Sequence, residues 1–199
     1  DKTRWKECLK CQKRIVDENL KDENELQSYF IKRITKFLME KGKIPIGWDE
    51  IIEGGLAKDI VVMCWRGDGK DALENAISSG NKAILCPNPI LYFDWKQNED
   101  SQGAFGVTTL TQVHDYEHEH AGISNKDKHL IFGVKANVWT EWMPTSKEVE
   151  FMAFPRMSAL AEVAWLQKNN KNWKIFLSRL TKFRSVLDKY SVNYYKETS

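Results

Sequence analysis

The sequence has 199 residues and a formal net charge of +2, from 30 lysines and arginines against 28 aspartates and glutamates. This length suits one domain with a real core and is short for two. The balanced charge argues against a nucleic-acid-binding protein, which usually carries a basic excess. No apolar stretch reaches the length of a bilayer-spanning helix. The opening residues DKTRWKECLK are neither a signal peptide nor a typical natural start, so we expect a fragment or a processed chain.

Four cysteines are present, and two of them form the motif CLKC at Cys8 and Cys11. A structural zinc site would need two more ligands, and a lone C-x-x-C is a weak signal for metal binding or redox chemistry. The sequence therefore favours ordinary thiols for these two and for Cys64 and Cys86. Cysteine usage leaves both the disulfide pairing and the cellular compartment open.

Hydrophobic spacing predicts the first elements in chain order. An amphipathic helix over residues 25–40 ends near Gly42. The segment KIPIGWDEI is short and extended, because Pro45 and Gly47 forbid a long helix, and a brief helix is expected within residues 51–58. The apolar run of residues 60–65 is typical of a strand buried on both faces. A helix over residues 69–80 and the short apolar runs KAILCP and ILYFD follow.

The second half begins with a long, polar and irregular stretch, residues 95–128, with a short helix expected in TTLTQVHDY. A connection of this length is usually functional or mobile. The run HLIFGVKANVW is the last predicted strand. A helix over residues 145–166 starts with Thr145 and Glu148 as a capping box, and Pro155 should kink or divide it. The amphipathic stretch 172–190 is the final helix.

Short apolar strands that alternate with helices indicate an α/β fold with parallel strands. Two architectures fit: a doubly wound sheet, or part of a (β/α)8 barrel. A dinucleotide-binding fold lacks its fingerprint, because no G-x-G-x-x-G follows a strand. The GDGK sequence after Trp65 does not have the spacing of a P-loop.

Aromatic side chains mark the ends of consecutive predicted strands: Trp48 in IGWDE, Trp65 in VVMCWRGD, Tyr92 in ILYFD and Trp139 in ANVWTE. In a barrel these strand ends converge on the active-site face, whereas the layers of the barrel core are mostly branched aliphatic residues. A core position remains the ordinary explanation for Trp48 or Trp65 taken singly.

Carboxylates accompany these aromatics. Asp49 and Glu50 are best explained as caps of the following helix. Asp94 lies two residues after Tyr92, and Glu141 two residues after Trp139, so each pair shares a strand face. A carboxylate on such a face would be a costly buried charge unless it lined a cleft. These four residues are therefore the better candidates for a binding site.

The stretch GVKANVWTEW sharpens this hypothesis. As a strand it would place Asn137, Trp139 and Glu141 on one face. The other face, with Val134, Ala136 and Val138, is small and apolar and suits packing against a helix. An aromatic ring beside a carboxylate is typical of a sugar-binding cleft, since the ring stacks on sugar C–H groups and the carboxylate accepts hydroxyl protons.

Three histidines gather in HDYEHEH, at His114, His118 and His120, with Asp115 and Glu117 beside them. Metal ligation is conceivable, but the spacing matches no familiar site. A solvated, charged loop is the favoured interpretation, and we expect neither a metal nor a cofactor.

Together, the motifs IPIGWDEI, MCWRG, ILYFD, GVKANVWTEW and FMAFPRMSALAEVAW resemble the β-N-acetylhexosaminidases of glycoside hydrolase family 20. TRWKECLKCQKRI and the closing stretch from FLSRLTKF to VNYY fit as well, so the resemblance covers nearly the whole chain. It implies a (β/α)8 barrel, of which residues 1–199 would be the C-terminal half, about strands five to eight. It also implies hydrolysis of terminal β-linked N-acetylglucosamine or N-acetylgalactosamine, in which the acetamido oxygen of the sugar is the nucleophile.

The resemblance assigns roles to the strand-end residues. Trp48, Trp65 and Trp139 would wall the pocket of the terminal sugar, and Tyr92 would hydrogen-bond the acetamido oxygen and align it. Asp94 and Glu141 would hold sugar hydroxyls. The partners would be glycans that end in N-acetylhexosamine. Bacterial members of the family are often exported and animal members are often lysosomal, so the resemblance implies an exported or lysosomal parent protein.

The sequence departs from the family in three places. The catalytic Asp–Glu pair lies in a His-x-Gly-Gly-Asp-Glu segment that this sequence lacks, so we expect little or no activity from this chain alone. Lys135 stands where glutamine is common, and Trp95 is too near Asp94 to match a further wall tryptophan. The open strand edges of a half-barrel favour pairing with the missing half or self-association.

Two other functions fit the same residues. A non-catalytic sugar-binding module would reuse the aromatic cleft, and a metal-dependent α/β hydrolase would use the histidine loop with Cys8 and Cys11. The binding module ranks second and the metal enzyme third.

Overall fold

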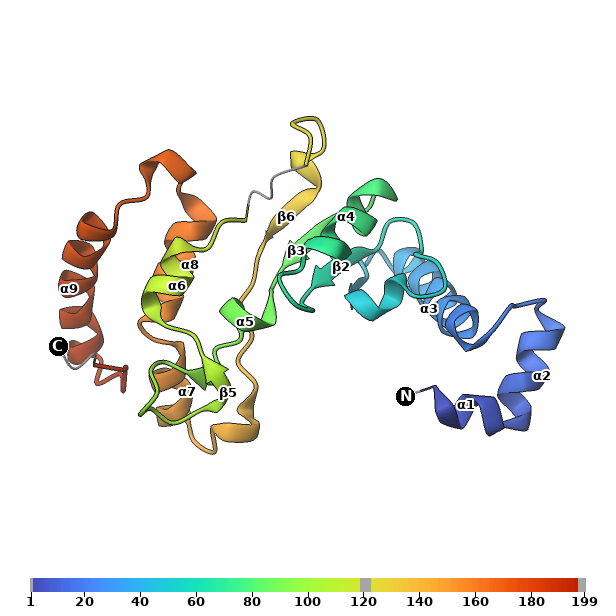
Figure 1. Ribbon diagram of the computed structural model, residues 1–199, viewed down its shortest axis with the longest axis horizontal. Coiled ribbons are helices and arrows are strands. Elements are labelled where there is room, and N and C mark those ends of the chain that lie inside the picture. The colour runs from blue at the N-terminus through green and yellow to red at the C-terminus, as the bar shows by residue number, and fades with distance from the viewer. Residues whose placement is uncertain (1, 119–122, 197–199) are drawn as a thin grey trace. The chain divides into compact units, whose positions relative to one another are not determined.

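The computed structural model describes residues 2–118 and 123–196 (Figure 1). His120, one of the three clustered histidines, lies outside these residues. The chain divides into two compact units, Asp1–Ile84 with Ile123–Phe132 and Leu85–Gly122 with Gly133–Ser199. Within the described residues, no helix is both long and apolar enough to cross a membrane.

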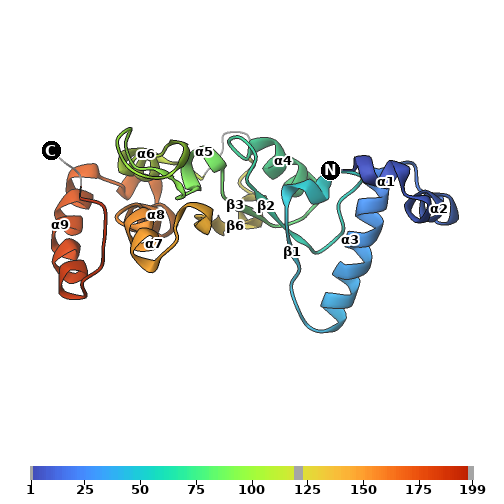
Figure 2. The ribbon, with the colours of Figure 1, turned by 90° about the horizontal axis from the view of Figure 1, so that it is seen from below.

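The first unit contains helices α1 (Thr3–Glu7), α2 (Leu9–Asp17), α3 (Glu23–Glu40) and α4 (Lys70–Ser78), and strands β1 (Ile46–Trp48) and β2 (Val61–Cys64). Short 3-10 turns η1 (Asp49–Ile52) and η2 (Lys128–Leu130) complete it. Figure 2 shows α3, β1, β2 and α4 in this unit. The predicted helix over residues 25–40 is confirmed. Asp22 caps it by accepting from the N–H groups of Asn24 and Glu25, at 2.8 and 3.0 Å.

The main sheet has the strand order β1-β2-β3-β6, where β3 is Ala83–Leu85 and β6 is Ile131–Val134. Strands β1 and β2 pair in parallel, with Ile46 opposite Val61 and Trp48 opposite Met63. Val61, Val62 and Cys64 are buried. This confirms the prediction that the apolar run of residues 60–65 is a buried strand.

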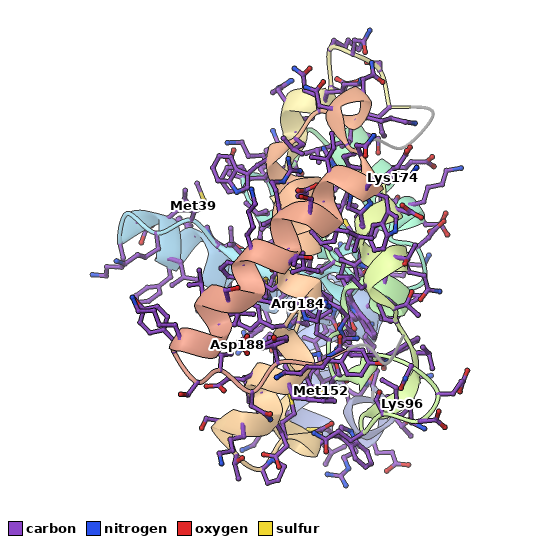
Figure 3. The ribbon with its side chains drawn as sticks, turned by 90° about the vertical axis from the view of Figure 1, so that its left-hand side faces the viewer. Met39, Lys96, Met152, Lys174, Arg184 and Asp188 are labelled. Atoms are coloured by element: carbon purple, nitrogen blue, oxygen red, sulfur yellow. The ribbon has the colours of Figure 1, made fainter. Side chains whose placement is uncertain are left out.

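The second unit is largely helical (Figures 1 and 3). Its helices are α5 (Asn88–Leu91), α6 (Leu110–Asp115), α7 (Ser146–Ala153), α8 (Arg156–Trp165) and α9 (Trp173–Lys189), with 3-10 turns η3 (Thr140–Trp142) and η4 (Lys168–Asn170). Strands β4 (Trp95–Lys96) and β5 (Ala104–Val107) form a small separate sheet. Figure 3 shows Lys174, Arg184 and Asp188 along α9.

One apolar core joins α5, α6, α8 and α9. Its buried members include Leu110 and Val113 of α6, Leu160 of α8, and Phe176 and Leu180 of α9. Partly buried Val134, Ala136 and Val138 pack against the same core, as predicted for the small apolar face of this stretch.

Pro155 divides the helix predicted over residues 145–166 into α7 and α8. The Phe154–Pro155 peptide bond between them is cis. At the start of α7 the backbone N–H of Thr145 donates to Glu148 at 3.1 Å, as expected for a capping box.

Two strand predictions were wrong in detail. ILYFD is not a strand: α5 includes Ile90 and Leu91, and Tyr92 makes only an isolated parallel bridge to Asn137. Pro89 in the first turn of α5 favours this helix start, because its missing N–H is not needed there. The last strand ends at Val134, and Glu141 lies in η3, so the period-two pattern does not extend from Asn137 to Glu141.

His114 corrects the interpretation of the histidine cluster as a solvated loop. Its side chain is buried at the end of α6, with its ring 5.1 Å from that of Trp173 and 4.9 Å from that of Phe176. Nε2 lies 3.6 Å from the Glu162 carboxylate. Aromatic neighbours and a nearby acid make His114 a core histidine at the α6–α9 contact.

Candidate active site

Two of the predicted site residues meet in the first unit. Trp48 ends β1 and Trp65 follows β2, so the parallel pairing of these strands brings the two indoles together. Their ring centroids are 6.4 Å apart and the planes are nearly perpendicular, at 82°. Both side chains are half-buried, which leaves part of each ring for a ligand.

The carboxylates beside Trp48 fix the position of Trp65. Asp49 is fully buried and accepts from the backbone N–H groups of Trp65 and Arg66, at 3.0 and 3.2 Å, and from the Arg66 guanidinium. Glu50 accepts from the indole N–H of Trp65 at 3.1 Å. The prediction that these acids cap a helix was wrong: neither makes a capping bond in η1, and both hold the loop after β2.

Two further predicted residues meet in the second unit. The rings of Tyr92 and Trp139 have centroids 6.2 Å apart and planes inclined at 50°. The backbone positions them, because the N–H of Phe93 donates to the carbonyl of Asn137 at 2.7 Å, and that of Asn137 to the carbonyl of Leu91 at 2.8 Å. Trp139 is 41% exposed, so part of its ring is open to a ligand.

Asp94, two residues after Tyr92, is a buried acid with 3% of its surface exposed. Its Oδ1 atom is buried and makes no hydrogen bond to the described residues. Burial raises the pKa of Asp94, the Arg156 guanidinium opposes the shift, and the charge of Glu141 adds to it. Glu141 itself is exposed in η3. A buried oxygen without a donor is costly, so it indicates a position where a ligand hydroxyl would donate.

Arg156 holds the segment that carries Tyr92 and Asp94. Its fully buried guanidinium donates to the carbonyls of Phe93 (2.7 Å), Trp95 (2.9 Å), Thr108 (3.0 Å) and Met152 (2.7 Å). It also lies over the Phe93 ring, 4.7 Å from the centroid. Two of these carbonyls flank Asp94, so the arginine fixes the backbone on both sides of that residue.

The charge of Arg156 persists despite its burial. Burial lowers its pKa to about 9, and Asp94 counteracts the shift, so the guanidinium is protonated at neutral pH. Reasoning from the sequence missed this residue. The available signal was a single cation within the apolar run FMAFPRMSALA, where an unpaired charge would be unfavourable.

Trp95 and Lys135, which the sequence also singled out, belong to neither aromatic pair. Trp95 packs against β5, since a Cβ on Gly106 would lie 2.7 Å from its indole ring. Lys135 donates its backbone N–H to Leu85 at 2.9 Å. In the described part of the chain, no three histidine, cysteine, aspartate or glutamate side chains come together as a metal site.

The match to known proteins covers most of the chain. Residues 1–168 match the model of the glycosyl hydrolase family 20 catalytic domain. The chain belongs to glycosyl hydrolase family 20. It is 39% identical over 198 residues to a beta-hexosaminidase of Porphyromonas gingivalis. The aligned region covers 98% of this chain and 25% of that protein. A beta-N-acetylhexosaminidase of Cellulomonas fimi is 26% identical over 177 residues, covering 87% of this chain and 36% of that protein.

Solved family 20 structures share the fold. A family 20 exo-beta-N-acetylglucosaminidase of Vibrio harveyi in complex with N-acetylglucosamine has a TM-score of 0.87 and 28% identity, covering 96% of this chain and 31% of that chain. The chain thus spans less than half the length of these relatives. It forms part of a (β/α)8 barrel, which confirms that architecture over a doubly wound sheet.

Proposed function

We propose that the parent protein is an exo-acting β-N-acetylhexosaminidase and that this chain supplies residues that hold the terminal N-acetylglucosamine or N-acetylgalactosamine. The observation that carries the proposal is Asp94: a buried carboxyl oxygen without a donor, next to an aromatic pair and an exposed acid. Sugar hydroxyls are donors of the right kind for such an oxygen. Family membership supports the same substrate class.

Each side chain then has a distinct role. Tyr92 donates its hydroxyl to the acetamido oxygen and aligns it with the anomeric carbon, a positioning effect of the kind that makes intramolecular attack fast. Trp48, Trp65 and Trp139 stack on the ring and the acetamido group. Asp94 and Glu141 accept from sugar hydroxyls.

The reaction is retaining and substrate-assisted. The acetamido oxygen attacks the anomeric carbon as the glycosidic bond breaks, an oxazolinium ion forms, and water then opens it. A glutamic acid must protonate the leaving oxygen, and this sequence lacks the His-x-Gly-Gly-Asp-Glu segment that carries it in the family. Loss of general-acid help costs about 10²–10⁴-fold in rate, so the 199-residue chain alone should be nearly inactive.

The test is hydrolysis of a chromogenic N-acetyl-β-glucosaminide by this chain and by a protein extended upstream through the family's Asp–Glu segment. Turnover by the extended protein alone, with Tyr92→Phe or Glu141→Ala reducing its kcat/KM by about tenfold or more, supports the proposal. Appreciable hydrolysis by the 199-residue chain would refute its inactivity. Lys135→Gln is the control, because it introduces the residue that members of the family commonly carry at this position, and it should leave turnover unchanged.

A non-catalytic sugar-binding module is the second candidate, since the half-exposed Trp139 beside Tyr92 would serve it equally well. It predicts that the extended protein binds N-acetylglucosamine in calorimetry and does not hydrolyse the chromogenic substrate.

We also propose an exported or lysosomal parent, which cell fractionation with an antibody to this chain would test.

A further inference from the structure

Lys2, the residue directly before α1, is bound to two other parts of the first unit. Its Nζ atom donates to Glu53 Oε2, directly after η1, at 2.6 Å, and to the side-chain oxygen of Asn24, at the start of α3. Only 22% of the Lys2 side chain is exposed. A lysine ammonium group on its flexible stem is usually surrounded by water, so these contacts order a side chain of a kind that is ordinarily mobile.

Glu53 connects Lys2 to the loop that carries Trp65. Its other carboxylate oxygen, Oε1, accepts from the Arg66 guanidinium at 2.9 Å. Arg66 also pairs with the buried Asp49, whose carboxylate accepts from the backbone N–H of Trp65 at 3.0 Å. Four side chains thus form one ion network: Lys2, Glu53, Arg66 and Asp49. The ion network runs from the start of α1 to the loop after β2.

The position of Glu53 is fixed from α3. Its carbonyl accepts from the hydroxyl of the buried Ser28 at 2.9 Å. The backbone of the next residue, Gly54, lies so close to Asn24 that a Cβ would be 2.1 Å from the Asn24 carbonyl oxygen. Hydrogen bonds from Lys2 and Arg66 hold the pKa of Glu53 below its ordinary value. The ion network therefore has a charged and well-anchored centre.

We propose that Lys2 and Glu53 are positioning residues for the general acid, because they attach the chain that follows the acid-bearing segment to the loop of Trp65. This inference rests on the function proposed above, in which the Asp–Glu segment directly upstream supplies that acid. The contacts of Lys2 then fix the point from which the acid reaches the glycosidic oxygen. A misplacement of about 1 Å in a reacting group can cost about 10²-fold in rate.

The step that depends on this position is cleavage of the glycosidic bond. As the acetamido oxygen attacks the anomeric carbon, the bond to the leaving oxygen breaks and the general acid gives its proton to that oxygen. A phenol leaving group needs this proton, whereas a dinitrophenolate is a weak base and departs largely without it. Misplacing the acid should therefore slow hydrolysis of a phenyl glycoside far more than that of a dinitrophenyl glycoside.

A purely structural role is the competing explanation for the ion network. The side chains of Arg66 and Glu53 are 46% and 40% exposed, and ion pairs at such positions contribute little to the free energy of unfolding. A structural role would slow both substrates to the same extent, together with a lower melting temperature. The positioning role instead predicts a difference between the two substrates with little change in melting temperature.

The test measures kcat/KM of the protein extended upstream through the Asp–Glu segment, on phenyl and dinitrophenyl N-acetyl-β-glucosaminides. Lys2→Met and Glu53→Gln should each lower the value by about tenfold or more for the phenyl substrate and by about twofold or less for the dinitrophenyl substrate. Lys2→Arg keeps the cation and should recover most of the loss. Lys13→Met is the matched control, because Lys13 forms an exposed ion pair with Asp17 in α2, at 2.8 Å, and it should change neither value.

Calorimetric melting of each variant would separate these effects from unfolding. If the wild-type extended protein hydrolyses both substrates, equal losses on the two in the variants, or no loss on either, would overturn this inference and leave the proposed function intact. No hydrolysis of either substrate by the wild-type extended protein would refute the proposed function, and this inference with it.

Discussion

Two charged side chains, Arg156 and Glu141, shift the pKa of Asp94 in opposite directions. Arg156 favours its ionised form, Glu141 disfavours it, and burial decides the direction by raising the pKa above the ordinary value of 3.8. Because the unfolded chain keeps the ordinary pKa, the folded state holds the proton more tightly between these two values. Folding stability is therefore present at low pH and lost as the pH rises through this window.

Asp94→Asn should remove this dependence. We expect the wild-type free energy of unfolding to fall as the pH rises from the ordinary aspartate pKa through the raised one, and the variant to show a flatter profile over the same window. Urea unfolding at a series of pH values measures both profiles. Asp100→Asn, at an exposed position, is the matched control, and an equally flat profile in that control would contradict the assignment to Asp94.

Arg156 fixes the backbone on both sides of Asp94 through its buried contacts to carbonyl groups. Arg156→Met should lower the free energy of unfolding by about 3–5 kcal/mol, because four carbonyls lose their donor at once. Arg156→Lys should recover only part of the loss, since an ammonium group lacks the planar fork.

Chemical denaturation of the three proteins would measure these losses. Arg179→Met is the control: Arg179 is exposed and pairs with Glu162, so its loss should cost about 1 kcal/mol or less. Equal effects at the two arginines would show that the buried contacts of Arg156 contribute little.

Among the elements, α3 and the loop after η1 make an unusually close approach. Gly54 has a φ of +81°, and a Cβ there would lie 2.1 Å from the carbonyl oxygen of Asn24, at the start of α3. Gly42 also has a positive φ, +68°, but its Cβ would meet nothing within 4 Å. Both glycines have a positive φ, but only at Gly54 would a Cβ overlap another atom. Comparing substitutions at the two positions therefore distinguishes the cost of backbone strain from the cost of steric overlap.

Gly54→Ala should destabilise the protein by about 1–3 kcal/mol more than Gly42→Ala, because only the first forces α3 and the loop apart. Thermal and urea unfolding of both variants would give the difference. Equal losses would mean that the loop moves away from Asn24 without penalty.

At the scale of the whole molecule, exposed apolar surface and open strand edges favour self-association. Strands β1 and β6 are at the two ends of the described sheet. On α3, Phe30 is 60% exposed and Phe37 is 54% exposed. Unpaired strand edges and contiguous apolar surface both promote association.

We therefore expect this chain to form concentration-dependent dimers or larger species in sedimentation velocity. Replacing both Phe30 and Phe37 by glutamine should shift the distribution towards monomer. The matched control is Tyr190→Gln, a 73% exposed aromatic at the end of α9. A single monomeric boundary for the wild-type protein at every concentration would contradict this expectation.

The sequence predicted elements whose signals are local. The amphipathic period of α3 and α9, the break at Pro155, and the apolar strand β2 all depend on neighbours within one or two turns. The sequence also singled out the aromatic pairs: Trp48 and Trp65 meet beside β1 and β2, and Tyr92 meets Trp139, although neither of these two lies at the end of a strand.

Other features depend on contacts between distant parts of the chain. Arg156 contacts carbonyls 48 to 63 residues away, at Thr108, Trp95 and Phe93. His114 is buried because α9 supplies Trp173 and Phe176. No local pattern records these partners, so the arginine was missed and the histidine was assigned to a solvated loop.

The division of the chain into two units has a consequence for protein engineering. The first unit is assembled from Asp1–Ile84 and Ile123–Phe132, and the second from Leu85–Gly122 and Gly133–Ser199, so each is discontinuous in the gene. Anyone who wishes to exchange one unit for that of a relative must replace two segments together. A chimaera joined at a single crossover after Ile84 would combine η2 and the first half of β6 from one parent with β1 and β2 from the other.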